Sequence, residues 1–468
     1  MDQRIVILGG GPGGYEAALV AAELGAEVTL VSDEGLGGNC VLWDCVPSKA
    51  LIVAAEAMGW LYKAGDLGVH VEGVEEADRT VVNFPEVSER VLSLGANQSA
   101  DIEQRVGSAG VTLVRGRGRI SGPHEVTVRG DDGGERTLSA DHVLLATGST
   151  ARILPFFEPD GERVLLGQQV YGLPEVPEHL IVVGSGATGA EFAHAFVRFG
   201  ADVTLVSSRD LILPTEDPDA AQVIEDVFER RGMTILRNAR ADACERTADG
   251  VRVGLTDGRS VEGSHVLFTV GQVPVADDLG LENVGIERTA QGGVEVDTVC
   301  RTSRSWVYAA GDVTSPVMLA SVAAMQGRTA MWHALGQAVQ PIRWDAVAAT
   351  IFTDPEVATV GLTPEEAEQA QVPIETAKLD FRSNPRAKMV HGTDGFVKVH
   401  AMVGSGIVVG GVVVAPRASD LIQPLAMAVQ NRMSVAQLAQ TMAIYPSMAG
   451  SVNEACRMLM SRLDRGDA

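Results

Sequence analysis

Two cysteines and a lysine stand close together in the stretch GGNCVLWDCVPSK, residues 37–49. Cys40 and Cys45 are five residues apart, and Lys49 follows four residues later. A close thiol pair in a reducing compartment is more often catalytic than structural. The pair therefore predicts redox chemistry at these sulfur atoms, with two unlinked buried thiols as the alternative interpretation.

A regular helix would keep the two sulfur atoms apart. Residues five positions apart on an α-helix are separated by a rise of about 7.5 Å, whereas a disulfide needs Cα atoms within roughly 7 Å. A bond between Cys40 and Cys45 therefore requires irregular backbone at this point. Pro47 favours an irregular helix start there, because proline removes a backbone donor.

Two glycine motifs with the spacing GxGxxG add a second kind of chemistry. The first glycine permits a tight turn, the second lets backbone N–H groups reach a pyrophosphate, and the third lets a helix pack closely on a strand. The motif residues are Gly9, Gly11 and Gly14, and then Gly184, Gly186 and Gly189. Two such motifs predict two dinucleotides with electron transfer between them, and a glycine turn without a ligand is the alternative.

The elements around these motifs have one design. Each motif lies between a buried apolar strand and an alanine-rich helix, followed by a second strand that ends in VTLVS. We predict βαβ units over residues 4–32 and 179–207. A helix is predicted over residues 84–110, and short β-rich stretches over residues 111–143 and 242–270.

The residues that follow each second strand predict how the dinucleotide ribose is bound. An acidic residue is expected there as the hydrogen-bond acceptor for the ribose. After the first unit, Ser32 precedes Asp33, so the acidic contact is moved by one residue. After the second unit the corresponding residues are Ser207, Ser208 and Arg209, and no acid occurs before position 210. This change favours NADPH or tolerance of both NADPH and NADH, with a solvent-facing Arg209 as the alternative.

Composition narrows the class of protein. The 468 residues predict about three domains. A net charge of −24, from 37 basic and 61 acidic residues, opposes binding to nucleic acid or to an anionic membrane surface. The apolar runs are shorter than the ~20 residues of a membrane span, and we expect no secretory signal. The five cysteines and nine histidines form neither a secreted disulfide framework nor a metal motif. We therefore expect a cytoplasmic protein with small-molecule partners, no membrane insertion and no metal.

The chain resembles the pyridine nucleotide–disulfide oxidoreductases over nearly its whole length. Besides GGNCVLWDCVPSK, the resemblance rests on LLATGS at 144–149, YAAGDV at 308–313 and FTDPEVATVGLT at 352–363. It implies an α/β fold with two Rossmann-like dinucleotide-binding domains and a C-terminal α+β dimerisation domain. FAD would bind residues 1–150 and 273–340, and NADPH or NADH would bind residues 151–272. Residues 341–468 would form the interface of a homodimer.

The resemblance also implies roles for single residues. Cys45 would face the flavin, Cys40 would meet the substrate, and Lys49 would lie at the flavin edge in an ion pair with Glu191. A buried lysine needs such a carboxylate partner, and its charge would stabilise the negative charge of reduced flavin. The other implied cofactor contacts are Thr147, Gly148, Gly271, Gly311 and Asp312.

The family pattern breaks near the C-terminus. In members of the family, a His-Pro pair followed by a Glu lies near the C-terminus. It supplies the acid–base group that protonates the leaving thiolate in disulfide reduction. The matching stretch AIYPSMAGSVNEA has Tyr445 at the histidine position and Gly450 at the glutamate position. A tyrosine can donate a proton but is a poor base at pH 7. In this respect the chain is similar to actinobacterial NAD(P)H:quinone reductases, although those tend to lose the first cysteine, which is retained here.

Three functions stay open. The first is an FAD-dependent oxidoreductase that passes electrons from NAD(P)H to a quinone or a similar small acceptor. The second is a reductase for an unidentified low-molecular-weight disulfide, with Tyr445 of the partner subunit as a candidate proton donor. The third is a flavin-bearing redox sensor with slow turnover. The cysteine pair favours the second and the missing dyad favours the first. We favour the first, because a dithiol can persist as an internal electron store, whereas disulfide turnover without a base is handicapped.

Overall fold

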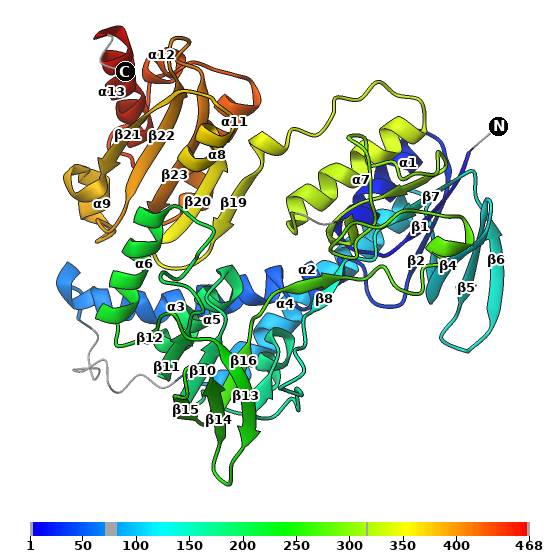
Figure 1. The fold of residues 1–468 in the computed structure, drawn as a ribbon, viewed down its shortest axis with the longest axis horizontal. Coiled ribbons are helices and arrows are strands. Elements are labelled where there is room, and N and C mark those ends of the chain that lie inside the picture. Colours follow the sequence, from blue (N-terminus) through cyan, green and yellow to red (C-terminus); the bar gives the residue numbers. More distant parts are fainter. Residues whose placement is uncertain (1–2, 71–81, 315–316, 466–468) are drawn as a thin grey trace.

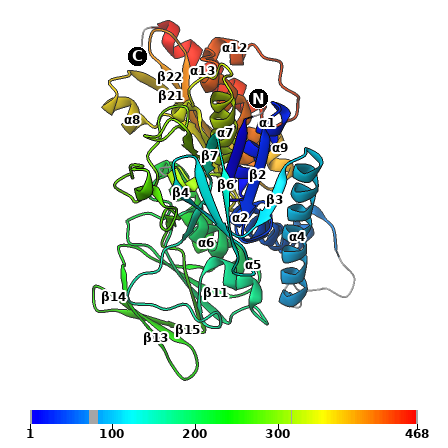
Figure 2. The ribbon, with the colours of Figure 1, turned by 90° about the vertical axis from the view of Figure 1, so that its right-hand side faces the viewer.

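The fold is built on three five-stranded sheets. Figure 1 shows them as separate lobes around the central helices α3 and α5. The computed structural model describes residues 3–70, 82–314 and 317–465. Figure 2 shows the C-terminal sheet at the top, the first parallel sheet in the middle and the small sheet β13–β15 at the bottom.

The first sheet is five-stranded and parallel, in the order β18-β7-β1-β2-β3. Its strands are β1 (Arg4–Leu8), β2 (Glu27–Ser32), β3 (Thr112–Arg115), β7 (His142–Leu145) and β18 (Val307–Ala309). Strand β18 lies far along the chain from the other four strands. The first sheet is therefore built from residues that precede the second sheet in the sequence and from residues that follow it. Helix α1 (Pro12–Glu23) packs against α7 (Ala320–Ala334) beside this sheet.

The second sheet is also five-stranded and parallel, in the order β12-β11-β10-β16-β9. Its strands are β9 (Val164–Leu165), β10 (His179–Val183), β11 (Asp202–Val206), β12 (Thr234–Leu236) and β16 (His265–Phe268). The helices that follow its first two central strands are α5 (Ala187–Arg198) and α6 (Pro218–Arg230). Both predicted βαβ units are therefore confirmed.

Smaller antiparallel pieces flank the parallel sheets. They are β4 (Arg117–Gly122) with β5 (Glu125–Arg129) and β6 (Glu135–Ser139), then β13 (Ala241–Arg246) with β14 (Val251–Leu255) and β15 (Ser260–Gly263), and β8 (Ser149–Ala151) with β17 (Gln272–Pro274). The β-rich stretches expected over 111–143 and 242–270 are confirmed, although their outer strands join the parallel sheets.

The C-terminal domain is a five-stranded antiparallel sheet covered by short helices. Its strand order is β19-β20-β23-β22-β21. The strands are β19 (Ala348–Ile351), β20 (Glu356–Gly361), β21 (Ile374–Asp380), β22 (Phe396–Met402) and β23 (Val408–Ala415). The helices are α8 (Pro364–Gln369), α9 (Pro385–Met389), α10 (Ala418–Leu421), α11 (Gln423–Gln430), α12 (Val435–Ala439) and α13 (Gly450–Arg465).

Three further helices join these parts. They are α2 (Gly38–Leu42), α3 (Cys45–Ala64) and α4 (Phe84–Ser108), the last confirming the helix predicted over 84–110. One apolar core extends from α3 and α4 through α5 to the second sheet and reaches β20, β22 and β23 of the C-terminal domain. This shared core places α3 and α5 at the junction of all three sheets.

Candidate functional site

The first glycine motif forms a tight turn between β1 and α1. Gly9 has a φ of 107°, and a Cβ on Gly14 would lie 1.9 Å from the Gly9 carbonyl oxygen. A Cβ on Gly11, by contrast, would meet no protein atom within 4 Å. Helix α1 begins without a side-chain cap, so its first backbone N–H groups are left for a ligand. A dinucleotide pyrophosphate fits this open, uncapped helix N-terminus.

The second glycine motif repeats this geometry between β10 and α5. Gly184 has a φ of 113°, and a Cβ on Gly189 would lie 1.8 Å from the Gly184 carbonyl oxygen. The space around a Cβ on Gly186 is again free of protein atoms within 4 Å, and α5 has no side-chain cap. The chain therefore has two structurally equivalent glycine turns, each at the start of an uncapped helix.

The end of β2 carries the first expected ribose contact. Ser32 is the last residue of this strand, and the following Asp33 accepts a 2.7 Å hydrogen bond from Arg117 Nε through Oδ2. Its other carboxylate oxygen accepts no hydrogen bond from any residue that the structure describes. The Asp33 side chain is 40% exposed, so the carboxylate can be reached from solution.

Cys40 and Cys45 lie on two different helices. Helix α2 ends at Leu42 and α3 begins at Cys45, with Trp43 and Asp44 outside helical geometry between them. The irregular backbone that the spacing argument requires is thus present, and both cysteines are free thiols.

The two thiols influence each other, and their pKa values shift in opposite directions. A hydrogen bond with Cys45 lowers the pKa of Cys40, while that bond and burial raise the pKa of Cys45. The pair therefore holds a single negative charge more readily than two. Lys49 lies near enough to favour the thiolate form of both cysteines.

Lys49 and Glu191 form an ion pair between α3 and α5. Lys49 Nζ lies 2.8 Å from Glu191 Oε2, and the Glu191 side chain is only 5% exposed. The other carboxylate oxygen accepts a 2.9 Å hydrogen bond from the Phe352 backbone N–H. Lys49 Nζ also lies 5.2 Å from the centre of the Phe352 ring. Burial works to lower the pKa of Lys49, but the charge and hydrogen bond of Glu191 raise it overall, so the lysine is charged.

Asp312 is brought next to the start of β8. Its Oδ2 accepts a 2.7 Å hydrogen bond from Ser149 Oγ, and the Ser149 carbonyl oxygen accepts a 2.7 Å hydrogen bond from Asn39 Nδ2 on α2. Burial raises the pKa of Asp312, and the Ser149 hydroxyl counteracts this. The Asp312 carboxylate is thereby tied to the helix that carries Cys40.

The residues around Asp312 are held by hydrogen bonds to backbone groups. The Gly311 N–H donates to Gln326 Oε1 at 2.7 Å, and Thr147 Oγ1 donates to the Val275 carbonyl oxygen at 2.6 Å. Three of the expected cofactor contacts have a positive φ, which favours glycine at these turns: Gly148, Gly271 and Gly311.

Ser207 turns its hydroxyl into the protein at the end of β11. The residue is fully buried, and Ser207 Oγ lies 2.8 Å from Ser185 Oγ, inside the second glycine motif. It also accepts a hydrogen bond from the Arg209 backbone N–H. Ser207 therefore ties the glycine turn to the strand end, while Ser208 and Arg209 are the exposed side chains at this point.

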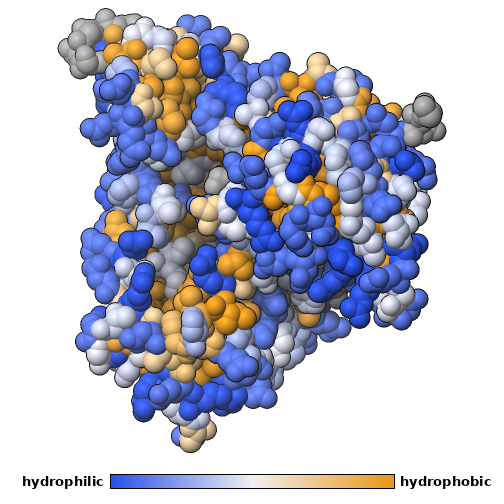
Figure 3. All heavy atoms as spheres, turned by 45° about the vertical axis from the view of Figure 1, so that its right-hand side comes forward, coloured by the Kyte–Doolittle hydropathy of each residue, from blue (hydrophilic) through white to orange (hydrophobic). Residues whose placement is uncertain are grey.

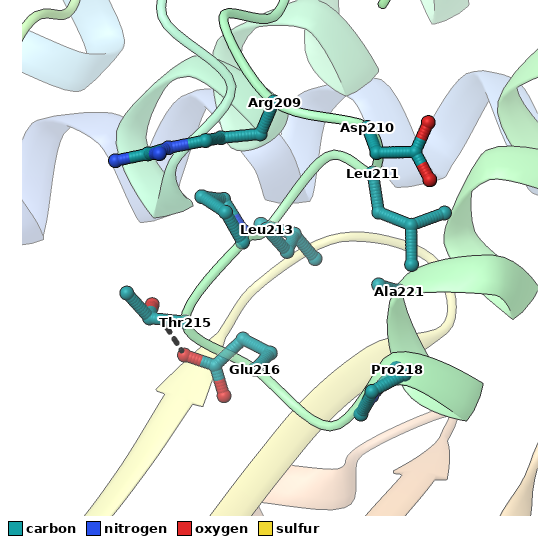
Figure 4. A pocket seen from close by; sticks show the side chains of 9 residues that line it. Arg209, Asp210, Leu211, Leu213, Thr215, Glu216, Pro218 and Ala221 are labelled. Atoms are coloured by element: carbon teal, nitrogen blue, oxygen red, sulfur yellow. Dashed lines mark hydrogen bonds between the residues drawn. The ribbon is translucent and has the colours of Figure 1, made fainter.

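Arg209 borders a cavity of about 370 Å³. Figure 4 shows its side chain extended away from that of Asp210, which points to the other side. Among the residues that the structure describes, none forms an ion pair with Arg209. The rest of the lining is Asp210, Leu211, Leu213, Pro214, Thr215, Glu216, Pro218 and Ala221.

Tyr445 is not brought to the other candidate residues within one chain. It lies between α12 and α13 of the C-terminal domain and is 83% exposed. Its neighbours Met442 and Ile444 are 98% and 82% exposed. Within the described residues, no hydrogen bond joins Tyr445 to Cys40 or Cys45.

Sequence reasoning missed several residues at the junction. Asp354 accepts hydrogen bonds from two arginines, and Phe352 holds Glu191. Tyr171 is buried with its hydroxyl unpartnered among the described residues, and burial followed by the charge of Asp44 raises its pKa. It lines a hollow of about 330 Å³ together with Trp43. Phe352 and Asp354 lie in the stretch FTDPEVATVGLT, but no local pattern in that stretch predicts a contact with Glu191.

No helix among the residues placed by the structure is long and apolar enough to cross a membrane. No group of three or more His, Cys, Asp or Glu side chains in that same part is arranged to hold a metal ion.

Comparison with protein-family models matches almost the whole chain. Residues 3–327 match the model described as pyridine nucleotide-disulphide oxidoreductase. Residues 347–456 match the dimerisation domain of the same family.

Individual proteins give a consistent result. The chain is 50% identical over 473 residues to a Mycobacterium tuberculosis protein named NAD(P)H dehydrogenase (quinone), covering 99% of this chain and 95% of that protein. It is 35% identical to dihydrolipoyl dehydrogenase 2 of Haloarcula marismortui, covering 97% of this chain and 95% of the relative. Among solved structures, LpdA from M. tuberculosis superposes with a TM-score of 0.93 at 50% identity, covering 98% of this chain and 100% of that one.

Proposed function

The chain belongs to the pyridine nucleotide-disulphide oxidoreductase family, and we propose that it passes electrons from NADPH through FAD to a quinone. It is an NAD(P)H-dependent FAD flavoprotein oxidoreductase, and the acceptor and the preference for NADPH are the parts that are proposed. When bound, FAD takes up two electrons from the pyridine nucleotide and delivers them to the acceptor. The M. tuberculosis relative that shares half its residues with this chain is named for a quinone acceptor.

One observation carries the choice of acceptor. Disulfide reduction needs an acid–base group beside the leaving thiolate, worth about 10²- to 10⁴-fold in rate. The positions of the histidine and glutamate of that dyad are Tyr445 and Gly450 in this chain. A quinone has no leaving thiolate, so its reduction does not need the missing dyad.

We assign the other residues as follows in this proposal. Gly9, Gly11 and Gly14 would hold the FAD pyrophosphate, with Asp33 at the ribose and Asp312 at the ribityl chain. Lys49, fixed by Glu191, would place its positive charge at the flavin edge. The single charge shared by Cys40 and Cys45 would lie beside the same ring, where the pair would store electrons.

We further propose that the protein is cytoplasmic and works as a homodimer whose C-terminal domains meet. The matched dimerisation domain supports this, as do the exposed apolar side chains of Met442, Ile444 and Tyr445. Figure 3 shows apolar side chains gathered on the C-terminal domain at the upper left, beside a hollow in the surface. In such a dimer Tyr445 would reach the flavin site of the partner.

A second candidate, reduction of a small disulfide, is favoured by one observation. Cys40 and Cys45 are both retained as free thiols, and each shifts the pKa of the other. Turnover would then proceed through a mixed disulfide with Cys40 and would need a substitute proton donor.

The two candidates predict opposite results for Cys40→Ser. We expect NADPH oxidation with a menadione-type quinone to survive in this variant, and wild-type turnover of small disulfides to be at least about 100-fold slower than that of the quinone. Steady-state assays of both acceptor classes measure this, with Cys244→Ser on β13 as the matched thiol control. Rapid turnover of one disulfide that disappears with Cys40 would rule out the quinone proposal.

A gain-of-function variant sharpens the same test. A Cβ on Gly450 would lie 3.7 Å from Ser447 Oγ, an ordinary contact, so the backbone at this position accepts a side chain. If the missing dyad is what prevents disulfide turnover, Tyr445→His combined with Gly450→Glu should raise that rate measurably above wild type.

We expect Arg209→Ala to weaken NADPH binding about tenfold, because one charge-assisted hydrogen bond to the 2′-phosphate is lost. NADH lacks this phosphate, so its dissociation constant should not change. Titration of the purified holoenzyme with each nucleotide provides the measurement. Arg252→Ala, which removes an exposed arginine paired with Glu262 on the small sheet, is the control. Equal effects on both nucleotides would contradict the assignment.

A further inference from the structure

The segment 352–354, between β19 and β20, bridges α3 and α5. At its first residue, the Phe352 N–H donates to Glu191 on α5, and the Phe352 ring lies under Lys49 of α3. Two residues later, Asp354 contacts the far ends of the same two helices. It accepts a 2.8 Å hydrogen bond from Arg198 Nη2 of α5. Asp354 also lies 3.9 Å from Lys63 Nζ at the end of α3. This three-residue segment of the C-terminal domain thus contacts each of the two helices at two points.

Asp354 is the anion that three cations share, and Glu56 is a further acidic group close enough to feel the Asp354 charge. Besides the bond from Arg198, Asp354 accepts a 2.7 Å hydrogen bond from Arg231 Nη2 and lies 3.9 Å from Lys63 Nζ. Its side chain is 22% exposed. Burial opposes ionisation, but Arg231 and Lys63 lower the pKa of Asp354 to about 2, so the carboxylate is charged.

The cluster has no second anion in hydrogen-bond contact with these cations among the described residues. His194, which lies 3.3 Å from Arg231 Nη1, is fully buried, and burial lowers its pKa to about 3. It is therefore neutral and cannot replace Asp354. Loss of the Asp354 charge would leave three cations facing one another, which would push the segment and the two helices apart.

The distance along α5 links this cluster to the ion pair. Glu191 and Arg198 are seven residues apart, which is about 10.5 Å along one helix face. Phe352 and Asp354 meet these two residues in the same order, so the segment runs alongside α5. The position of the Phe352 N–H against Glu191 consequently depends on how firmly Asp354 is held.

We propose that Asp354 is a positioning residue for the Lys49–Glu191 pair. It holds segment 352–354 in place, the Phe352 N–H then fixes Glu191, and Glu191 fixes the charge of Lys49 at the flavin. The effect lies in the reduction of the flavin by NADPH, so it does not depend on which acceptor is used.

Other ion pairs join the C-terminal domain to the second-sheet region without this connection. Arg230 lies 2.6 Å from Asp394, and Lys398 lies 2.7 Å from Asp217. No described hydrogen bond links either pair to Glu191. They serve as controls for domain attachment alone.

The test is the Asp354→Asn variant of the FAD-loaded protein. We expect anaerobic flavin reduction by NADPH to slow about tenfold. At a fixed potential the ratio of reduced to oxidised flavin should also fall about tenfold, equal to about 30 mV for a two-electron couple, because Lys49 no longer stabilises the reduced form fully. Asp354→Glu should recover part of both effects, and Asp394→Asn should behave as wild type.

Two further variants make the result decisive. Arg198→Met keeps Asp354 neutralised by Arg231 and Lys63, so it should fold even if Asp354→Asn does not, and its potential should shift in the same direction by a smaller amount. In a Glu191→Gln background, Asp354→Asn should cause no additional shift, because the connecting carboxylate is already absent. An unchanged potential in either Asp354→Asn or Arg198→Met, or an equal loss in Asp394→Asn, would overturn the proposal.

Discussion

Lys49→Met should lower the free energy of unfolding by about 3 kcal/mol and slow flavin reduction by NADPH about 100-fold. The loss of stability is expected because Glu191 is 5% exposed and would remain as a buried carboxylate without its cation. The 2.9 Å hydrogen bond from the Phe352 N–H would still be made, so the loss should lie at the lower end of the range for broken buried pairs. The loss of rate is expected because Lys49 is the cation that the proposal places at the flavin edge.

A double variant separates these two effects. Lys49→Met combined with Glu191→Leu replaces the pair with apolar side chains, which is often neutral for stability. We expect most of the unfolding free energy to return and the slow flavin reduction to remain. Urea unfolding and anaerobic stopped-flow reduction are the measurements, and Lys388→Met, at an exposed lysine of α9, is the matched control. If the double variant were as unstable as Lys49→Met, buried charge would not explain the loss.

Gly186→Ala should weaken binding of NADPH about 100-fold while changing the stability of the protein by less than about 1 kcal/mol. Gly186 has φ −74° and ψ −172°, which alanine adopts without strain. The added Cβ would meet no protein atom within 4 Å. Any conflict must therefore be with the bound pyrophosphate, which the second glycine of the motif admits.

The neighbouring glycine provides the contrast. A Cβ on Gly189 would lie 1.8 Å from the Gly184 carbonyl oxygen, so Gly189→Ala should lower the melting temperature as well as the affinity. Nucleotide titration, FAD content and thermal unfolding distinguish the two variants, with Gly107→Ala in α4 as a control at another open position. Unchanged NADPH binding in Gly186→Ala would show that the pyrophosphate does not pass over this residue.

The sequence alone was sufficient for the parts of the protein that depend on short-range rules. Glycine spacing, apolar strands and alanine-rich helices predict both βαβ units, because tight turns and helix periodicity are set by neighbouring residues. Pro47 likewise favours an irregular helix start near Cys45, because a proline acts on its neighbouring residues. The quoted motifs also led to the family that the comparisons show.

Only the tertiary structure decided which side chains meet across the three sheets. Phe352 and Glu191 are 161 residues apart in the chain, and Arg198 and Asp354 are 156 apart. Contacts of this kind arise from the shared core between α3, α5 and the C-terminal sheet, and no local pattern encodes them. The same holds for Ser207, whose hydroxyl could face the ribose or the interior at an identical strand end. Its orientation depends on Ser185, a partner 22 residues away, because a buried hydroxyl must find a hydrogen bond where packing places one.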